Sequence, residues 1–391
     1  MALIETYTRW PIVPVKAEGT HVWDEAGRKY LDFTSGIGVV SVGHCHPQVV
    51  QRVEQQLHKL WHVSNLFPIP AQEKLAERLT EASGLYAAFF CNSGAEANEA
   101  AIKLARKVGH EMKGIEQPEI MTFTQSFHGR TLATLTATGQ DKVKDGFTPL
   151  PPGFRTVRWG DISALEQALT PNTVAVLLEV VQGEGGVRPA DQAWLQRVEQ
   201  LCRDNGMLLM IDEVQTGMGR TGALFAHEHY GIRPDVVTLA KGLGNGFPVG
   251  CLLATSKAAA HFGPGSHGST FGGNPLAMEA GLGVLSVLQQ PGFIDEVKEK
   301  GHALHAALTA TLDSHPLVTE VRGLGLMLGI VLNEPRAPEL IAAARHKGLL
   351  VLPAGTDVVR LLPPLIVSET EIEQAVEILT QVFAATEAGV S

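Results

Sequence analysis

The chain has few cysteines and no long apolar run. Its 391 residues contain four cysteines, none with C-x-x-C spacing: Cys45, Cys91, Cys202 and Cys251. This usage is typical of a reducing compartment, and it does not match a zinc or disulfide framework. The longest apolar runs, such as Leu326–Leu332, are too short to span a bilayer, and the first residues lack a secretory signal core. We therefore expect a cytoplasmic protein.

Positive charge is also scarce. There are 31 Lys and Arg residues against 41 Asp and Glu residues, which gives a net charge of −10, and no basic run occurs. This balance argues against nucleic acid and anionic membrane as partners, so local arginines must hold any anionic substrate. With 45% apolar residues, a chain of this length predicts a large core and two domains.

Common phosphate-loop and metal signatures are missing. Gly242 and Gly244 lack the third glycine of a dinucleotide fingerprint, because Phe247 occupies its place, and no G-x-x-x-x-G-K-[ST] occurs. Four histidines near the N-terminus have neither H-E-x-x-H spacing nor cysteine partners: His44, His46, His58 and His62. We therefore expect no metal, and we interpret this region as a loop that enters a helix at Pro47.

The most informative stretch that is present is Val236–Gly250. Val236–Leu239 is apolar on both faces and predicts a buried parallel strand, with Lys241 at its carboxyl end. Open α/β sheets bind their ligands at this end. A lysine among apolar neighbours loses hydration, which lowers its pKa and frees an amine for Schiff-base chemistry. The alternative is a surface lysine in a glycine-rich turn. Whether other parts of the chain supply partners for this lysine decides between the two interpretations.

One such partner is Asp212, which follows the apolar strand Met207–Ile211. A carboxylate at the end of a buried strand is costly unless a cation or hydrogen bonds compensate it. Asp212 precedes Lys241 by about one βαβ unit, so both residues are expected on one crevice of a parallel sheet.

A possible anion site follows the strand Ala87–Cys91. Ser93 and Glu96 form a capping box at a helix start, and small residues at Gly94 and Ala95 leave room for a phosphate. By itself this pattern indicates only a capped helix.

Two further expected strands end in polar segments. Ile120–Thr124 leads to Phe127, which could stack on a flat ligand, and to Arg130, which could bind a carboxylate. Val174–Val181 leads to Glu184. Each residue also has a structural interpretation, as a core aromatic, a surface cation or a solvated turn residue. Together, however, these groups match what pyridoxal phosphate needs: an amine for its aldehyde, a buried acid for its ring nitrogen and a site for its phosphate. The aromatic ring and the arginines would serve stacking and carboxylate binding.

The segment after Pro291-Gly292 predicts an α+β unit. We expect helices around 337–347 and after Ser368, strands near 318–322, 326–332 and 349–352, and a strand at 358–362 that carries Arg360. The expected division is an N-terminal segment 1–45 that joins the small domain, a large cofactor-binding domain 46–290, and a C-terminal small α+β domain 291–391.

The chain resembles the class III (ω-) aminotransferases of fold type I from Tyr7 to about Phe383. The shared motifs are NSGAEANEAAIKLAR, SFHGRT, QGEGGV, IDEVQTGMGRTG, TLAKGLGNGFPVG and GSTFGGNP. This resemblance implies an α/β fold whose large domain has a mostly parallel central sheet, with pyridoxal 5'-phosphate as cofactor.

The resemblance also implies a role for each site residue. Lys241 carries the cofactor as a Schiff base and later moves a proton, while Asp212 pairs with the ring nitrogen. The other implied cofactor contacts are Gln215 at the ring hydroxyl, Val214 and Phe127 on the ring faces, and Ser93, Gly94 and Ala95 at the phosphate. Thr270 would reach the phosphate of a neighbouring subunit, which implies a homodimer. The implied substrate contacts are Arg130, Ser269 and the pair Glu184 and Arg360, in which Glu184 masks Arg360.

The implied reaction transfers a side-chain amine to 2-oxoglutarate. Ornithine-specific members place tyrosines near the positions of Ile37 and Pro68 to hold a free α-amino group. Their absence favours an acylated donor, N²-acetylornithine. The alternatives are ornithine, 4-aminobutyrate or succinyl-diaminopimelate as donor, a semialdehyde aminomutase, and a non-catalytic cofactor-binding regulator.

Overall fold

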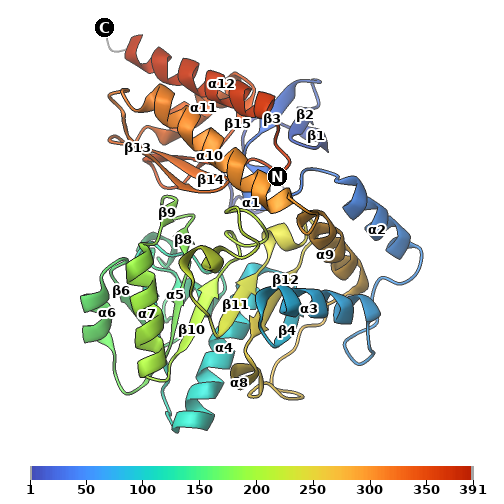
Figure 1. The fold of residues 1–391 in the computed structure, drawn as a ribbon, viewed down its shortest axis with the longest axis vertical. Helices are drawn as coiled ribbons and strands as arrows, with labels where there is room; N and C mark the ends of the chain where they lie inside the picture. The colour runs from blue at the N-terminus through green and yellow to red at the C-terminus, as the bar shows by residue number, and fades with distance from the viewer. Residues whose placement is uncertain (1, 389–391) are drawn as a thin grey trace.

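A seven-stranded sheet forms the centre of the protein. The structure, a computed structural model, describes residues 2–388 (Figure 1). The strand order is β4-β12-β11-β10-β7-β5-β6, and only β12 in this sheet runs antiparallel to its neighbours. The bounds are β4 Ala87–Cys91, β5 Glu119–Phe123, β6 Phe154–Val157, β7 Thr173–Leu178, β10 Leu208–Asp212, β11 Val236–Leu239 and β12 Gly250–Ala254. The observed sheet is therefore mostly parallel, as the sequence predicts.

Helices cover both faces of this sheet, which is why its inner strands are apolar along their whole length. Every residue of β7, β10, β11 and β12 is buried. The covering helices are α2 Pro47–Leu57, α3 Pro70–Ser83, α4 Gly94–Lys113, α5 Leu132–Ala137, α6 Ile162–Ala168, α7 Gln192–Asp204, α8 Ser256–Ala259 and α9 Pro275–Leu288. Pro47 begins α2 after the predicted loop.

The C-terminal part builds a second body above this sheet in Figure 1. Its antiparallel sheet has the order β13-β14-β17-β16, with bounds Val318–Leu324, Met327–Leu332, Val358–Leu361 and Leu352–Pro353. Its helices are α10 Phe293–Leu312, α11 Ala337–His346 and α12 Glu369–Ala388.

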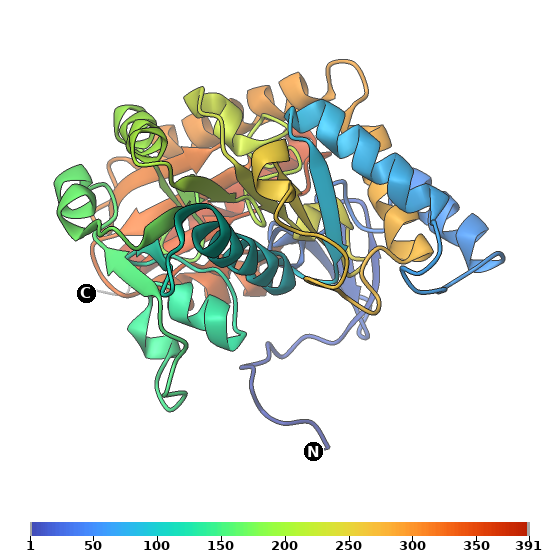
Figure 2. The ribbon, with the colours of Figure 1, turned by 90° about the horizontal axis from the view of Figure 1, so that it is seen from below.

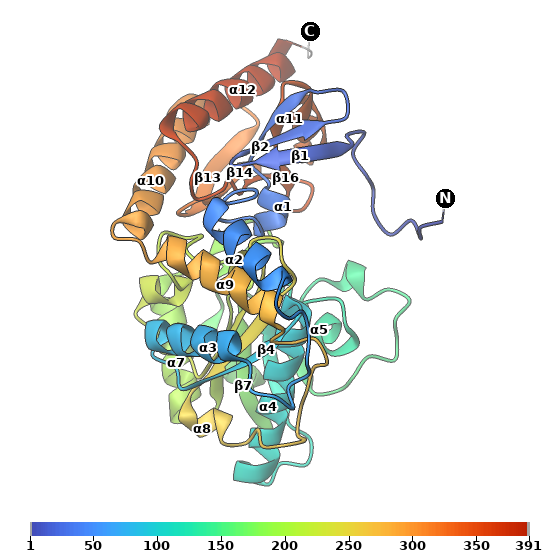
Figure 3. The ribbon, with the colours of Figure 1, turned by 90° about the vertical axis from the view of Figure 1, so that its right-hand side faces the viewer.

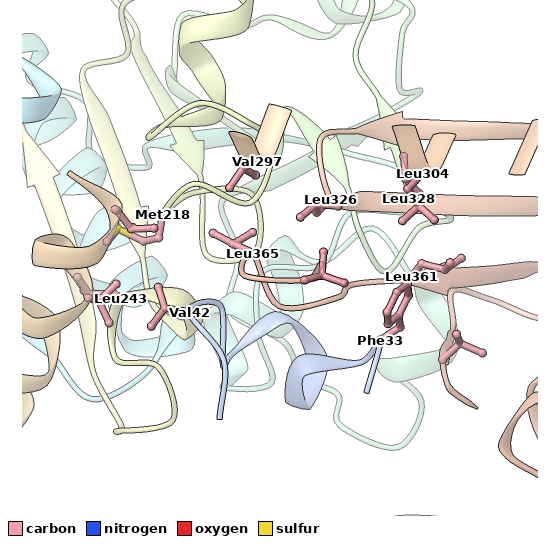
Figure 4. Packing of buried hydrophobic residues seen from close by; sticks show 14 of the residues in the cluster. Phe33, Val42, Met218, Leu243, Val297, Leu304, Leu326, Leu328, Leu361 and Leu365 are labelled. Atoms are coloured by element: carbon pink, nitrogen blue, oxygen red, sulfur yellow. The ribbon is translucent and has the colours of Figure 1, made fainter. Parts of the chain in front are cut away.

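The N-terminal strands lie beside this C-terminal part. β1 Pro14–Glu18, β2 His21–Asp24 and β3 Lys29–Asp32 form a sheet with β15 Leu349–Leu350, in which β3 pairs in parallel with β15. The hairpin of β2 and β3 turns through Gly27 at φ +80°. One hydrophobic cluster runs from Leu243 and Met218 to Leu328 and Leu361, so the core continues across the junction (Figure 4). The domain limits given above remain a prediction.

Three local elements differ from expectation. The strand expected at 349–352 is divided into β15 and β16, which belong to two different sheets. Val174–Val181 is not one strand, because β7 ends at Leu178 and the short β8, Val181–Gln182, pairs with β9, Arg188–Pro189. Between β7 and β8, the buried Glu179 binds main-chain N–H groups of other segments instead of continuing the sheet. The sequence reading also did not predict β12 as a strand.

A left-handed turn follows β3. Ser35–Gly38, labelled α1, has φ values of 47°, 62°, 67° and 73°. Ile37 is β-branched, and this region costs roughly 1–2 kcal/mol for such a residue. The turn is held from both sides. The Asp32 carboxylate accepts hydrogen bonds from Thr34 and Ser35, and the Ser35 hydroxyl donates to the Leu362 carbonyl at 2.6 Å.

The first residues extend away from the body, as Figures 2 and 3 show. Leu3, Ile4 and Tyr7 in this segment are exposed. Among the helices of residues 2–388, none combines the length and the apolar character that a membrane crossing needs.

Candidate active site

Lys241 lies at the carboxyl end of β11. It begins the single-turn helix η3, Lys241–Leu243, with φ 39°. Within residues 2–388, no hydrogen bond or salt bridge engages its amine, which faces the cavity described below. Desolvation lowers the pKa of Lys241, and the charge of Arg360 lowers it further, although Glu184 and Asp212 oppose this shift. Burial thus makes the Lys241 amine easier to deprotonate than an exposed lysine.

Asp212 ends the neighbouring strand β10 and is buried. Its Oδ2 accepts hydrogen bonds from Asn98 Nδ2 at 2.7 Å and pairs with His128 Nδ1 at 2.8 Å, while its Oδ1 accepts from Val214 N–H at 3.0 Å. These bonds replace the hydration that a buried carboxylate loses. The sequence predicts no role for His128 or Asn98, although both lie in the motifs shared with the class III aminotransferases.

The start of α4 forms an anion cradle. Ser93 caps the helix by accepting from Glu96 N–H at 3.2 Å. The N–H groups of Gly94 and Ala95 have no acceptor within residues 2–388, and both residues line the cavity. A Cβ at position 94 would lie 2.7 Å from Val214, so only glycine allows this approach.

Phe127 and Arg130 also line the cavity, with the guanidinium of Arg130 5.7 Å from the Phe127 ring centroid. Phe127 N–H donates to Glu179 Oε1 at 2.9 Å. Burial raises the pKa of Glu179 well above its ordinary value, and the nearby charge of Asp212 adds to this shift. Glu179 lines the cavity, but it was hidden inside a strand expected to run to Val181.

All of these groups open onto one cavity of about 400 Å³. The cavity brings together most of the sequence-predicted residues: Ser93, Gly94, Ala95, Phe127, Arg130, Asp212, Val214, Gln215 and Lys241. Its volume is in the range of small-molecule and cofactor sites.

Beside the cavity, Arg360 of β17 is bound by Glu184. Arg360 Nη1 lies 2.6 Å from Glu184 Oε1 and donates to Gln215 Oε1 at 3.0 Å. Gln215 Nε2 also donates to Glu184, at 3.3 Å, so its amide is engaged by this pair. Burial would raise the pKa of Glu184, but the charge and hydrogen bond of Arg360 outweigh it and lower the pKa. Glu184 is therefore a stable anion on a buried arginine.

Ser269 and Thr270 do not line this cavity. They line a second one of about 400 Å³ together with Asn92 and Glu96. Ser269 Oγ accepts from Asn92 Nδ2 at 3.1 Å and from Gly272 N–H at 3.0 Å. The roles predicted for both residues remain predictions.

The residues of the first cavity fit pyridoxal phosphate. The group needs an amine for its aldehyde, an acid for its ring nitrogen and N–H donors for its phosphate. Lys241, Asp212 and the start of α4 offer these groups around one cavity. Asn98 Nδ2 and Val214 N–H both donate to the Asp212 carboxylate and hold it in place at the cavity.

The lowered pKa of Lys241 leads to a pH prediction. We expect the cofactor-free protein to take up pyridoxal phosphate faster as pH rises, with the midpoint of this rise below pH 10.5, because the pKa of Lys241 is lowered. Stopped-flow quenching of tryptophan fluorescence measures this rate. The exposed Lys257→Ala variant should give the same profile. A midpoint at or above pH 10.5 would contradict the lowered pKa.

The doubly covered, mostly parallel sheet and a lysine–aspartate pair at its strand ends define a pyridoxal phosphate-dependent enzyme. Residues 4–383 match the family model for aminotransferase class III, and the chain belongs to this family. It is therefore a transaminase whose substrates are amino acids and 2-oxo acids.

Known proteins agree with this assignment. The chain is 52% identical over 380 residues to the acetylornithine aminotransferase of Bacillus cereus, covering 97% of both chains. It is 51% identical over 384 residues to that of Bacillus subtilis, covering 98% of both chains. Among solved structures, an ornithine aminotransferase from Toxoplasma gondii superposes with a TM-score of 0.96 at 32% identity, covering 99% of this chain and 94% of the other. An acetylornithine aminotransferase from Elizabethkingia anophelis gives 0.88 at 33% identity, with 98% and 96% covered.

Proposed function

We propose that the protein is an acetylornithine aminotransferase of arginine biosynthesis. It transfers the δ-amino group of N²-acetylornithine to 2-oxoglutarate, and the products are N-acetylglutamate 5-semialdehyde and glutamate. The observation that carries this proposal is the Glu184–Arg360 pair beside the Lys241 cavity. The names of the bacterial relatives support it. The four scattered, free cysteines suit a cytoplasmic location.

The cavity residues have the following proposed roles. Lys241 holds the cofactor and moves a proton at the carbon that bears the transferred amine. Asp212, oriented by Asn98 and His128, keeps the ring nitrogen protonated. Ser93, Gly94 and Ala95 hold the phosphate, Val214 and Phe127 confine the ring, and Gln215 reaches its hydroxyl once it leaves Arg360. When bound, pyridoxal phosphate supplies an electron sink for the carbanion.

Glu184 and Arg360 would allow one site to accept two kinds of substrate. A buried arginine needs an anion, and Glu184 supplies it while a side-chain amine reacts. When glutamate or 2-oxoglutarate binds, its α-carboxylate takes the place of Glu184 on Arg360. Arg130 at the cavity and Ser269 would then contact the remaining carboxylate.

The preferred donor can be tested directly. The left-handed turn presents the half-exposed Ile37 beside Val39, which lines the cavity, and Ile37 offers no hydroxyl to a free α-amino group. We therefore expect kcat/KM for N²-acetylornithine to exceed that for ornithine by at least about tenfold, which corresponds to about 1.4 kcal/mol. A donor panel against 2-oxoglutarate measures this ratio, with 4-aminobutyrate and succinyl-diaminopimelate included.

A preference for ornithine would instead favour the activity named for the Toxoplasma gondii structure. In that case the proposed substrate would be wrong. Turnover without 2-oxoglutarate would point to an aminomutase, and no turnover of any donor would favour a non-catalytic regulator.

We also propose that the active unit is a homodimer with sites at its interface. The segment between α2 and α3 exposes large apolar side chains at Leu60, Trp61, Leu66 and Phe67, and Phe271 next to Thr270 is exposed as well. The His62 ring lies 5.3 Å from the Phe271 ring, so the two segments meet. Exposed apolar side chains gathered in this way are typical of a protein–protein interface. Thr270 would then reach the partner subunit's cofactor phosphate.

A further inference from the structure

The turn that carries Glu184 is packed tightly against its surroundings. A Cβ at Gly183 would lie 2.3 Å from Gln215 Oε1, and one at Gly185 would lie 2.5 Å from the Gln125 carbonyl. Val187 closes the turn at φ 51°, an unfavourable value for a β-branched residue. This backbone therefore needs anchors that hold it in place.

One anchor comes from β13. Arg322 donates from Nη2 and Nε to the Gly186 carbonyl, at 2.7 and 3.1 Å, and from Nε to the Val187 carbonyl at 3.1 Å. Its third nitrogen, Nη1, pairs with Glu320 at 2.7 Å. A planar guanidinium suits this forked contact, which a lysine ammonium cannot reproduce.

Arg322 and Arg360 belong to one row of the C-terminal sheet. Arg322 lies opposite Gly329 of β14, and Gly329 lies opposite Arg360 of β17. Side chains of directly opposed residues project from the same face, so both arginines face the turn. The position between them is a glycine, and a Cβ there would lie 3.0 Å from Val187.

The two arginines thus hold different parts of the same turn. Arg322 donates to the main-chain carbonyls of the turn, and Val187 of the turn lies next to Gly329. Arg360 donates to the Glu184 carboxylate of the turn, and its other hydrogen bonds go to Gln215 and Pro353 outside it. With the backbone fixed, Glu184 can leave Arg360 by side-chain rotation alone. We propose that Arg322 and Gly329 are positioning residues that set how firmly Glu184 masks Arg360, and hence the balance between the two substrate classes. This inference rests on the proposed function.

The first test measures the masking without turnover. Glutarate, a five-carbon dicarboxylate, is titrated calorimetrically into the cofactor-loaded protein. Arg322→Met removes the anchor, Arg322→Lys keeps its charge, and Gly329→Ala displaces Val187 without changing any charge. We expect each variant to bind glutarate more tightly, by roughly tenfold for Arg322→Met, because a displaced Glu184 competes less well. Loss of a positive charge alone would weaken anion binding, so tightening identifies the change in masking.

The second readout is the ratio of kcat/KM for glutamate to kcat/KM for N²-acetylornithine, which should rise by a similar factor in the same variants. The matched surface variant Arg336→Met should leave both readouts within about twofold. Thermal unfolding shows which variants fold. If Arg322→Met does not fold, the glutarate affinities of Arg322→Lys and Gly329→Ala test the inference in its place.

Unchanged or weaker glutarate binding in both Arg322→Lys and Gly329→Ala would overturn the inference. A failure of the proposed function is distinguishable, since it would appear as no transfer from N²-acetylornithine by the unmodified protein.

Discussion

Replacing Lys241 with alanine should abolish transamination. The variant loses the amine that faces the cavity at the end of β11, and with it both the attachment of the cofactor and the proton carrier. Loss of a positioned acid–base group alone costs about 10²–10⁴-fold, so we expect kcat to fall by at least about 10⁴-fold when attachment is lost as well. Initial rates with N²-acetylornithine and 2-oxoglutarate measure the change.

Cofactor binding separates this effect from misfolding. The N–H donors of α4 and the carboxylate of Asp212 do not depend on Lys241, so the variant should still retain pyridoxal phosphate in equilibrium dialysis. Lys257→Ala, an exposed lysine in α8, serves as the matched control and should keep full activity. If Lys241→Ala kept more than about a tenth of the activity, the proposed chemistry at this cavity would be wrong.

The arrangement of the main strands could be predicted because each apolar run ends at a polar residue that marks the end of its strand. The apolar runs before Asp212 and Lys241 are buried on both faces, and β10 and β11 are indeed parallel neighbours, with Asp212 opposite Thr238. Apolar strands separated by helices allow few other arrangements. Fold class and the central lysine–aspartate pair therefore follow from local pattern.

The partners of Asp212 could not be predicted in this way. Asn98 lies on the buried face of α4 and His128 lies in a loop, and nothing in their sequence spacing to Asp212 shows that they meet. Their contact depends on how α4 packs across the ends of β10 and β5. Only the packed structure contains that information.

Glu179 and the conformation of Ile37 were missed for a different reason. An apolar run hides Glu179, because seven of the eight residues from Val174 to Val181 suit a buried strand. Ile37 does not favour a left-handed turn by propensity, and the turn is held by the bond from the Ser35 hydroxyl to the distant Leu362 carbonyl, with local support from Asp32. In both cases, long-range contacts override the local preference.

Asp212→Asn is expected to have the second largest effect. Oδ2 of Asp212 already binds Asn98 and His128, so an asparagine would use its one oxygen there. Its amide would then replace Oδ1, which now accepts from Val214 N–H, and would offer a donor to the cavity. A donor cannot stabilise a protonated ring nitrogen, so the electron sink is weakened.

The loss of one preorganised electrostatic contact with a developing charge corresponds to about 10²–10³-fold in kcat. Rapid-mixing absorbance on each half-reaction should show both slowed, because both need the same carbanion. Asp161→Asn changes a carboxylate that only caps α6 and should leave both rates unchanged. Because the Val214 N–H loses its acceptor, the free energy of unfolding should fall by about 1–3 kcal/mol. A variant that kept rates within tenfold of the parent would show that the ring nitrogen is not held by Asp212.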